Sequence, residues 1–331
     1  MKRFFCKWKG IILANPVKGI KLVFQSIVQL YRDNVGVKEV TKRYGKLHED
    51  KTFYVIRRPS PGGGLFSNFQ WVLGHIIYAV EKNYIPVVDM QNYKTYYNEK
   101  EPINGTENSW EYYFKQPTSF TLKDAYKAQN TILAEMKFPS SIIPVFFETN
   151  EQIDFFSTWI AKYMQFNEIT KKYIEESKQE LFNGKKNILG VLYRGTDYLG
   201  LKPRNHPILP SIDDCIAKAN ECLDKWEVDR IFLVTEDMDA VKIFEKTFGE
   251  KLIITNSKRI ENYKKEMGGI PSLSFERQHD NYLKGLEYIR DVYLLSLCDS
   301  IIAPRVNGST IALALNNNKY KHKYIFSLGQ Y

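Results

Sequence analysis

One short segment, residues 190–197, combines residue types that suit a phosphate site. It reads Gly-Val-Leu-Tyr-Arg-Gly-Thr-Asp. The guanidinium of Arg194 offers a planar fork of donors that matches a phosphate. The simpler alternative is a surface turn in which Arg194 pairs with Asp197. The apolar residues 188–193 predict a buried strand, so Arg194 is expected at the strand's carboxyl end, where open α/β sheets bind ligands.

Two further loops are expected at the same sheet edge. One follows the predicted strand 230–235, and the other, Pro-Arg-Val-Asn-Gly-Ser-Thr at 304–310, precedes a predicted helix. The amides of a helix N-terminus carry partial positive charge and bind anions. The alternative is that Ser309 or Thr310 only caps its helix. We predict a diphosphate site whose polar residues in these loops are Thr235, Glu236, Asp237, Arg305, Asn307, Ser309 and Thr310.

The chemistry of the predicted site requires a choice between metal and acid–base catalysis. Asp237 and Asp239 have the DxD spacing of some metal sites, but acidic residues are also favoured where a helix begins. We therefore expect no metal. His206, in the loop Pro-Arg-Asn-His-Pro, is either a general base, a ligand for a sugar hydroxyl, or an exposed loop histidine. The predicted catalytic residues are Arg194, Asp197 and His206.

The first half of the chain contains one predicted βαβ unit. A strand at 53–57 leads through a glycine-rich turn into a helix at 65–84 and a strand at 85–90. Gly63 and Gly64 of this turn are further candidate ligand-binding residues. The turn is neither GxGxxG nor a P-loop, so a dehydrogenase or kinase is not supported. The aromatic run 108–117 predicts either a sugar-stacking surface or core.

The second half repeats this alternation and predicts a parallel sheet. Strands are expected at 187–193, 230–235, 251–255 and 300–303, with helices between and after them at 211–226, 238–248, 282–298 and 309–316. Helical residues 150–182 precede a linker at 183–186. We predict an α/β protein with two Rossmann-like domains, 46–182 and 183–331, that face each other across a cleft.

The chain of 331 residues has a net charge of +9 that is concentrated at its start. Residues 1–32 contain seven of the 47 basic side chains and no acidic one. Apolar residues at helical spacing follow, so residues 1–45 predict an amphipathic arm that binds an anionic membrane surface or packs on the protein's own body. The nearly neutral remainder argues against nucleic acid. Four cysteines without a CxxC pair read as reduced thiols, and we expect a cytoplasmic location on the inner face of the membrane.

Three motifs, in order, resemble those of the fucosyltransferase-like superfamily. Residues 191–197 resemble its HxRR(T/G)D motif, residues 231–237 its strand ending in Ala-Thr-Asp, and residues 295–310 its serine-containing third motif. Residues 64–70 resemble its amino-terminal Gly-x-Phe-Gly-Asn-Gln loop. Leu192 and Gly195 stand where the family has a histidine and a second arginine.

The resemblance implies a GT-B fold and an inverting, metal-independent glycosyltransferase without a cofactor, using a nucleotide sugar, usually GDP-fucose. It implies that Arg194 neutralises the departing diphosphate, Ser309 and Thr310 bind its phosphates, Asp291 pairs with the purine, and Asn68 approaches the diphosphate. The expected acceptor is a bacterial surface glycan or a lipid-linked glycan. The alternatives are another nucleotide sugar, or a non-catalytic membrane-associated scaffold with the same fold.

Overall fold

The computed structural model describes residues 39–331 except 138, 140 and 141, and contains two sheets. The first has the strand order β1-β4-β2-β3. Strand β2 runs parallel to both β3 and β4, and β1 runs antiparallel to β4. Its strands are β1 (Val40–Lys42), β2 (Leu47–Ile56), β3 (Ile85–Val88) and β4 (Ala128–Leu133).

Helix α3 (Leu65–Glu81) connects β2 with β3 and completes the predicted βαβ unit. It is buried on nearly all sides, because it contacts β2 and β3 as well as the helices α5 and α11. The short α4 (Leu122–Ala125) begins with a capping box between Thr121 and Asp124 and precedes β4.

The second sheet has the order β7-β6-β5-β8-β9, with every neighbouring pair parallel. Strand β5 lies in the middle and is buried at every residue, as its uninterrupted apolar run predicts. The strands are β5 (Ile188–Leu192), β6 (Arg230–Val234), β7 (Leu252–Ile253), β8 (Ser300–Pro304) and β9 (His322–Phe326).

Helices connect these strands and cover the sheet. Helix α8 opens with a capping box between Ser211 and Asp214, and Asp237 caps α9. The elements in this half are α7 (Asp197–Leu201), α8 (Ile212–Lys225), α9 (Met238–Phe248), α10 (Asp280–Ser296) and α11 (Asn307–Asn316), with 3₁₀ turns η1 (Gly249–Lys251), η2 (Lys265–Met267) and η3 (Ile270–Ser272).

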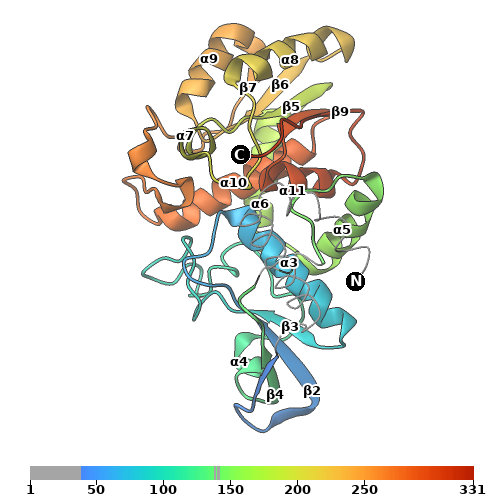
Figure 1. The fold of residues 1–331 in the computed structure, drawn as a ribbon, viewed down its shortest axis with the longest axis vertical. Helices are drawn as coiled ribbons and strands as arrows, with labels where there is room; N and C mark the ends of the chain where they lie inside the picture. Colours follow the sequence, from blue (N-terminus) through green and yellow to red (C-terminus); the bar gives the residue numbers. More distant parts are fainter. Residues whose placement is uncertain (1–38, 138, 140–141) are drawn as a thin grey trace, which may run out of the picture.

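The two halves share a continuous core. Helices α5 (Asn150–Tyr163) and α6 (Glu168–Phe182) lie between the sheets (Figure 1), where α5 contacts α3 and α11 and α6 contacts α10. Tyr113 joins the halves directly, because its hydroxyl donates to the carbonyl of Tyr282 on α10 at 2.9 Å. The predicted α/β architecture of two sheets is confirmed.

Several elements differ from the sequence expectation. Strands β1, β4 and β9 and helix α7 were not predicted, and the first sheet carries one antiparallel edge strand. Trp110 and Phe114, in the aromatic run, are buried and stack on each other with ring centroids 4.4 Å apart. That run is core and not an exposed sugar-stacking surface. The division at residues 182 and 183 stays a prediction, and residues 1–38 of the predicted arm lie outside the described residues.

Candidate active site

A cleft lies between the two halves, at the carboxyl edge of the second sheet. It encloses about 940 Å³ of empty space, including its opening to solvent. The ends of β5 and β6 form its floor, the start of α3 contributes Gly64 and Leu65, and Tyr288 and Asp291 of α10 form one side. Ile270 and other residues of the segment 256–279, which precedes α10, form another wall. The cleft is therefore built from both halves.

Arg194 follows β5 and lines the cleft. Its Nη2 donates to Asp197 Oδ1 at 2.8 Å and to Oδ2 at 3.0 Å, and its Nε donates to Oδ1 at 3.2 Å. Its guanidinium lies 4.4 Å from the ring centroid of Tyr198. Burial lowers the pKa of Arg194, but the carboxylates of Asp197 and Glu236 outweigh that effect and raise it above its ordinary value. Arg194 is therefore a permanent cation in the cleft, and none of its described hydrogen bonds uses Nη1.

Asp197 connects this arginine to the segment that walls the cleft. Besides the contacts from Arg194, its Oδ2 accepts a hydrogen bond from the backbone N–H of Ile270 at 3.1 Å. The side chain is 8% exposed and is not among the residues that line the cleft. The ion pair that the sequence offered as the simpler alternative is thus present, and it does not remove Arg194 from the cleft.

Glu236 follows β6 and also lines the cleft. Its Oε1 accepts a hydrogen bond from Thr196 Oγ1 at 2.7 Å. Burial raises the pKa of Glu236 above its ordinary value, although Arg194 and the Thr196 hydrogen bond act in the opposite direction. The neighbouring Thr235 lines the cleft, and its hydroxyl accepts from the amide of Asp237 at 3.2 Å.

Asp237 is engaged in capping helix α9. Its Oδ1 accepts from the amides of Asp239 and Ala240 at 2.9 and 3.2 Å, which is the role expected of an acidic residue at a helix start. Among residues 39–331, with their short gaps, no group of three or more histidine, cysteine, aspartate or glutamate side chains is arranged to hold a metal ion.

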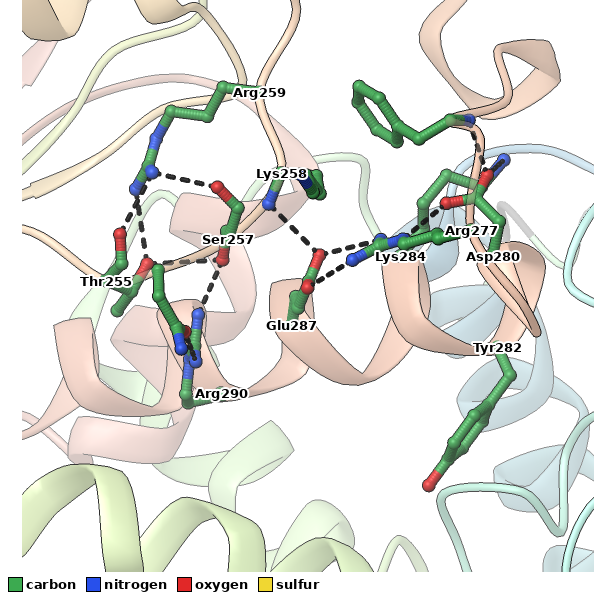
Figure 2. A network of polar contacts seen from close by, with 12 residues as sticks. Thr255, Ser257, Lys258, Arg259, Arg277, Asp280, Tyr282, Lys284, Glu287 and Arg290 are labelled. Atoms are coloured by element: carbon green, nitrogen blue, oxygen red, sulfur yellow. Dashed lines mark hydrogen bonds and ion pairs between the residues drawn. The ribbon is translucent and has the colours of Figure 1, made fainter.

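Charged side chains of α10 and the segment before it form a network beside the cleft (Figure 2). Arg290 Nε donates to Asp291 Oδ1 at 3.0 Å, and Ser257 Oγ donates to Asp291 Oδ2 at 2.8 Å. One turn earlier, Arg277 binds Glu287 through both terminal nitrogens at 2.6 and 3.0 Å. Asp291, expected near the purine, therefore lines the cleft as an ion-paired carboxylate.

The turn before α3 is held by an arginine that the sequence analysis did not single out. Arg58 donates to Asn68 Oδ1 at 2.6 Å, and the same oxygen accepts from the amide of Gly63 at 3.1 Å. Burial lowers the pKa of Arg58 to about 10. Gly64 lines the cleft, whereas Asn68 is buried beneath the turn and acts on its shape.

The third predicted loop lies behind the cleft wall. Ser309 and Thr310 are completely buried, and each hydroxyl donates to the carbonyl of Val306, at 2.8 and 3.0 Å. Arg305 pairs with Glu148 and donates to Ser327 Oγ at 3.2 Å. Asn307 is the first residue of α11 and is half-buried. None of these four side chains is among those that line the cleft.

His206 lies near Arg194 without lining the cleft. Its Nδ1 is 3.0 Å from the hydroxyl of Tyr198, whose ring lies under the Arg194 guanidinium. Burial and the charge of Arg194 lower the pKa of His206. The structure thus gathers Gly64, Arg194, Thr235, Glu236 and Asp291 at one cleft. His206 does not line this cleft and contacts Tyr198, which lies between it and Arg194.

The residues that sequence reasoning missed include Tyr97, Lys258, Lys284 and Tyr288, which all line the cleft. Lys284 pairs with Asp280 at 3.6 Å, and burial lowers its pKa. Tyr288 lies on α10 one turn before Asp291, so the helical spacing from a predicted site residue was the available signal. Tyr97 and Lys258 lie outside predicted elements and carried no such signal.

Comparison with known proteins gave matches among solved structures alone. No family model matches this chain, and no curated protein does. A NodZ α-1,6-fucosyltransferase soaked with GDP-fucose matches at 14% identity over 80% of this chain and 92% of that one, with a TM-score of 0.46. A mutant of Arabidopsis thaliana FUT1 in complex with GDP matches at 9% identity over 83% and 70%, with a TM-score of 0.42.

POFUT1 in its apo form matches at 10% identity over 85% of this chain and 75% of that one, with a TM-score of 0.39. These likenesses concern the course of the chain and assign no role to individual residues. Over the part of the chain that is described, no helix combines the length and the apolar character needed to cross a bilayer.

Proposed function

We propose that this protein is a glycosyltransferase that takes a sugar from a nucleoside diphosphate. The observation that carries the proposal is the cleft between the halves, with Arg194 at the carboxyl end of the central strand β5. Parallel sheets bind nucleotides at this edge. A fixed cation there stabilises the negative charge that develops on a departing diphosphate.

The ordered motifs of the sequence support a more specific assignment. Their resemblance to fucosyltransferases favours GDP-fucose as the donor and inverting transfer without a metal. The solved structures similar to this chain include a fucosyltransferase soaked with GDP-fucose and a FUT1 mutant in complex with GDP. Asp291 lines the cleft, which supports its proposed role as the acceptor of a hydrogen bond from the purine. The proposed acceptor is a surface glycan or a lipid-linked glycan, reached from the inner face of the cytoplasmic membrane through the basic residues 1–32.

A ligand screen tests the proposal. Thermal unfolding of the full chain is followed with GDP, UDP, ADP and their sugars, because a ligand present at 100 times its Kd stabilises the folded state by about 2.7 kcal/mol. We expect GDP and GDP-fucose to raise Tm most. If no nucleotide raises Tm, the proposal of an enzyme is rejected in favour of a non-catalytic scaffold. If UDP raises Tm more than GDP does, GDP-fucose is rejected as the donor.

The membrane role has its own test. Deleting residues 1–32 is expected to abolish binding to vesicles that contain anionic lipid, while GDP binding stays at the level of the full chain. Unchanged vesicle binding would show that the arm is not the membrane contact. Since the two assays share no readout, the failure of one leaves the other proposal standing.

A further inference from the structure

The cleft holds one carboxylate that differs from its neighbours in having no cationic partner. Glu287 is paired with Arg277 at 2.6 Å and Asp291 with Arg290 at 3.0 Å. Glu236 lines the same cleft, and within the described residues no lysine, arginine or histidine nitrogen lies at ion-pair distance from it. A carboxylate already bound to a guanidinium is a weak base, because the positive charge favours its ionised form. No guanidinium is bound directly to Glu236, although the charge of Arg194 acts on it from a greater distance.

The other two candidates for a base are less suited by their contacts. Both oxygens of Asp197 accept from Arg194, and Oδ2 also accepts from the amide of Ile270. His206 does not line the cleft, and its Nδ1 is engaged with Tyr198. A general base must reach the proton that it removes. Their contacts assign Asp197 to holding Arg194 and His206 to holding Tyr198.

The register of the sheet places Glu236 beside Arg194. Leu192 of β5 pairs with Val234 of β6, and Arg194 and Glu236 each follow their strand's pair by two residues. Glu236 Oε1 accepts a hydrogen bond from the Thr196 hydroxyl, and the residue's own backbone N–H also acts on the carboxylate. These local contacts hold the side chain in place at the cleft.

We propose that Glu236 is the general base that deprotonates the acceptor hydroxyl, an inference that rests on the proposed function. The acceptor oxygen forms a bond to the anomeric carbon of the donor sugar, and its proton passes to Glu236. The bond between that carbon and the diphosphate oxygen breaks, and its electron pair leaves with the nucleoside diphosphate. The positive charge of Arg194 offsets the added charge on the leaving group.

The electrostatics of the site agree with this role. Burial raises the pKa of Glu236, and Asp197 acts in the same direction, whereas Arg194 and the Thr196 hydrogen bond lower it. The phenols of Tyr193, which follows β5, and of Tyr288 on α10 also interact with it. A carboxylate with a raised pKa is a stronger base near neutral pH.

The test compares two nucleophiles with GDP-fucose as the probe. Water needs a base to lose its proton, whereas azide is already an anion and needs none. For Glu236→Gln we expect GDP release by hydrolysis to fall about 100-fold or more, with azide-dependent GDP release within threefold of the wild type. The acid limb of the wild-type pH–rate profile should disappear in the variant, and GDP affinity should stay within threefold.

Controls separate the possible failures. Glu245→Gln, an exposed glutamate on α9, should match the wild type in every assay. If Glu236→Gln does not fold, Glu236→Asp replaces it and should be slower with the acid limb retained. If Glu236→Gln hydrolyses GDP-fucose at the wild-type rate, or loses the water and azide reactions equally, Glu236 is not the general base. The proposal that the protein is a glycosyltransferase would still stand. A wild type that neither binds GDP nor releases it with either nucleophile would overturn the proposed function itself.

Discussion

The ion pair between Arg194 and Asp197 makes a quantitative prediction, because one partner faces the cleft and the other is enclosed. The side chains are 21% and 8% exposed, with their atoms 2.8 Å apart. Removing one partner of a buried pair typically costs 3–5 kcal/mol, because the other charge is left uncompensated. Since Arg194 is partly exposed, we expect Arg194→Met to lower the free energy of unfolding by about 3 kcal/mol, at the lower end of that range.

The double variant distinguishes the pair's structural role from its function. Replacing a buried pair with neutral groups is often nearly neutral for stability. In Arg194→Met/Asp197→Asn, the introduced carboxamide still offers an oxygen to the amide of Ile270. We therefore expect the double variant to recover to within about 1 kcal/mol of the wild type. Its GDP affinity should stay roughly 10- to 150-fold below that of the wild type, since a hydrogen bond to a charged group contributes about 1.5–3 kcal/mol.

Urea unfolding followed by tryptophan fluorescence measures the stabilities, and titration calorimetry with GDP measures the affinities. Lys225→Met removes an exposed pair with Glu221 and should cost less than about 1 kcal/mol. Asp197→Asn alone should keep GDP affinity at or above the wild-type level, because the carboxylate that is bound directly to Arg194 is then gone. Wild-type GDP affinity in the double variant would refute Arg194 as the phosphate-binding cation, and an affinity loss in Asp197→Asn equal to that of Arg194→Met would refute the division of roles.

Three further predictions concern the frame around the site. Burial lowers the pKa of His75 from 6.5 to about 4, so as the pH falls the unfolded chain binds a proton at this histidine before the folded chain does. The free energy of unfolding should therefore fall by about 3 kcal/mol between pH 6.5 and pH 4. Urea unfolding of His75→Gln, measured across the same pH range, should lack this part of the decrease. Gly285→Ala should lower stability by about 1–3 kcal/mol, since a methyl group there meets the Tyr113 hydroxyl, and a Tm equal to the wild type's would contradict that packing. Ser309→Ala should lower stability by about 0.5–1.5 kcal/mol, because it removes a hydrogen bond from the Val306 amide, which keeps its second acceptor, the carbonyl of Pro304. Calorimetry should show GDP affinity within twofold of the wild type, and a tenfold loss would assign the hydroxyl to phosphate.

The parts of the fold that the sequence predicted are those with a strong local pattern. Strand β5 is an apolar run, β6 and β8 are apolar after their first residue, and the predicted helices α8, α9 and α11 come after them in the chain. Strand β4 reads Ala-Gln-Asn-Thr-Ile-Leu and has no such pattern; it exists because β2 and β1 pair with its two edges. Strand β9 lies at the sheet's outer edge beside β8, and lysine-rich sequence leads into it. Long-range pairing determines both, and a local reading does not detect it.

The same distinction explains which part of the site was predictable. Parallel strands bring their carboxyl ends together, so the loops after β5 and β6 were expected to meet, and Arg194 and Glu236 both line the cleft. The loop after β8 was expected there too, but its serine and threonine hydroxyls bond to their own main chain. The order of the strands predicts where a loop lies. The direction of a short polar side chain in that loop depends instead on which backbone carbonyl is close enough to accept its hydrogen bond.

The choice between Asp197 and Glu236 shows what a sequence alone leaves open about an active site. Both are acidic residues in loops at the same sheet edge, and Asp197 has the closer spacing to Arg194. That closeness is what engages Asp197, because a carboxylate three residues after an arginine, at a helix start, folds back onto the guanidinium. Glu236 is 42 residues from Arg194 in the chain, but the two residues lie side by side in the sheet, because each follows by two residues the paired Leu192 and Val234. The residue next to the arginine in sequence thus holds it, and the residue next to it in the sheet stays available for chemistry.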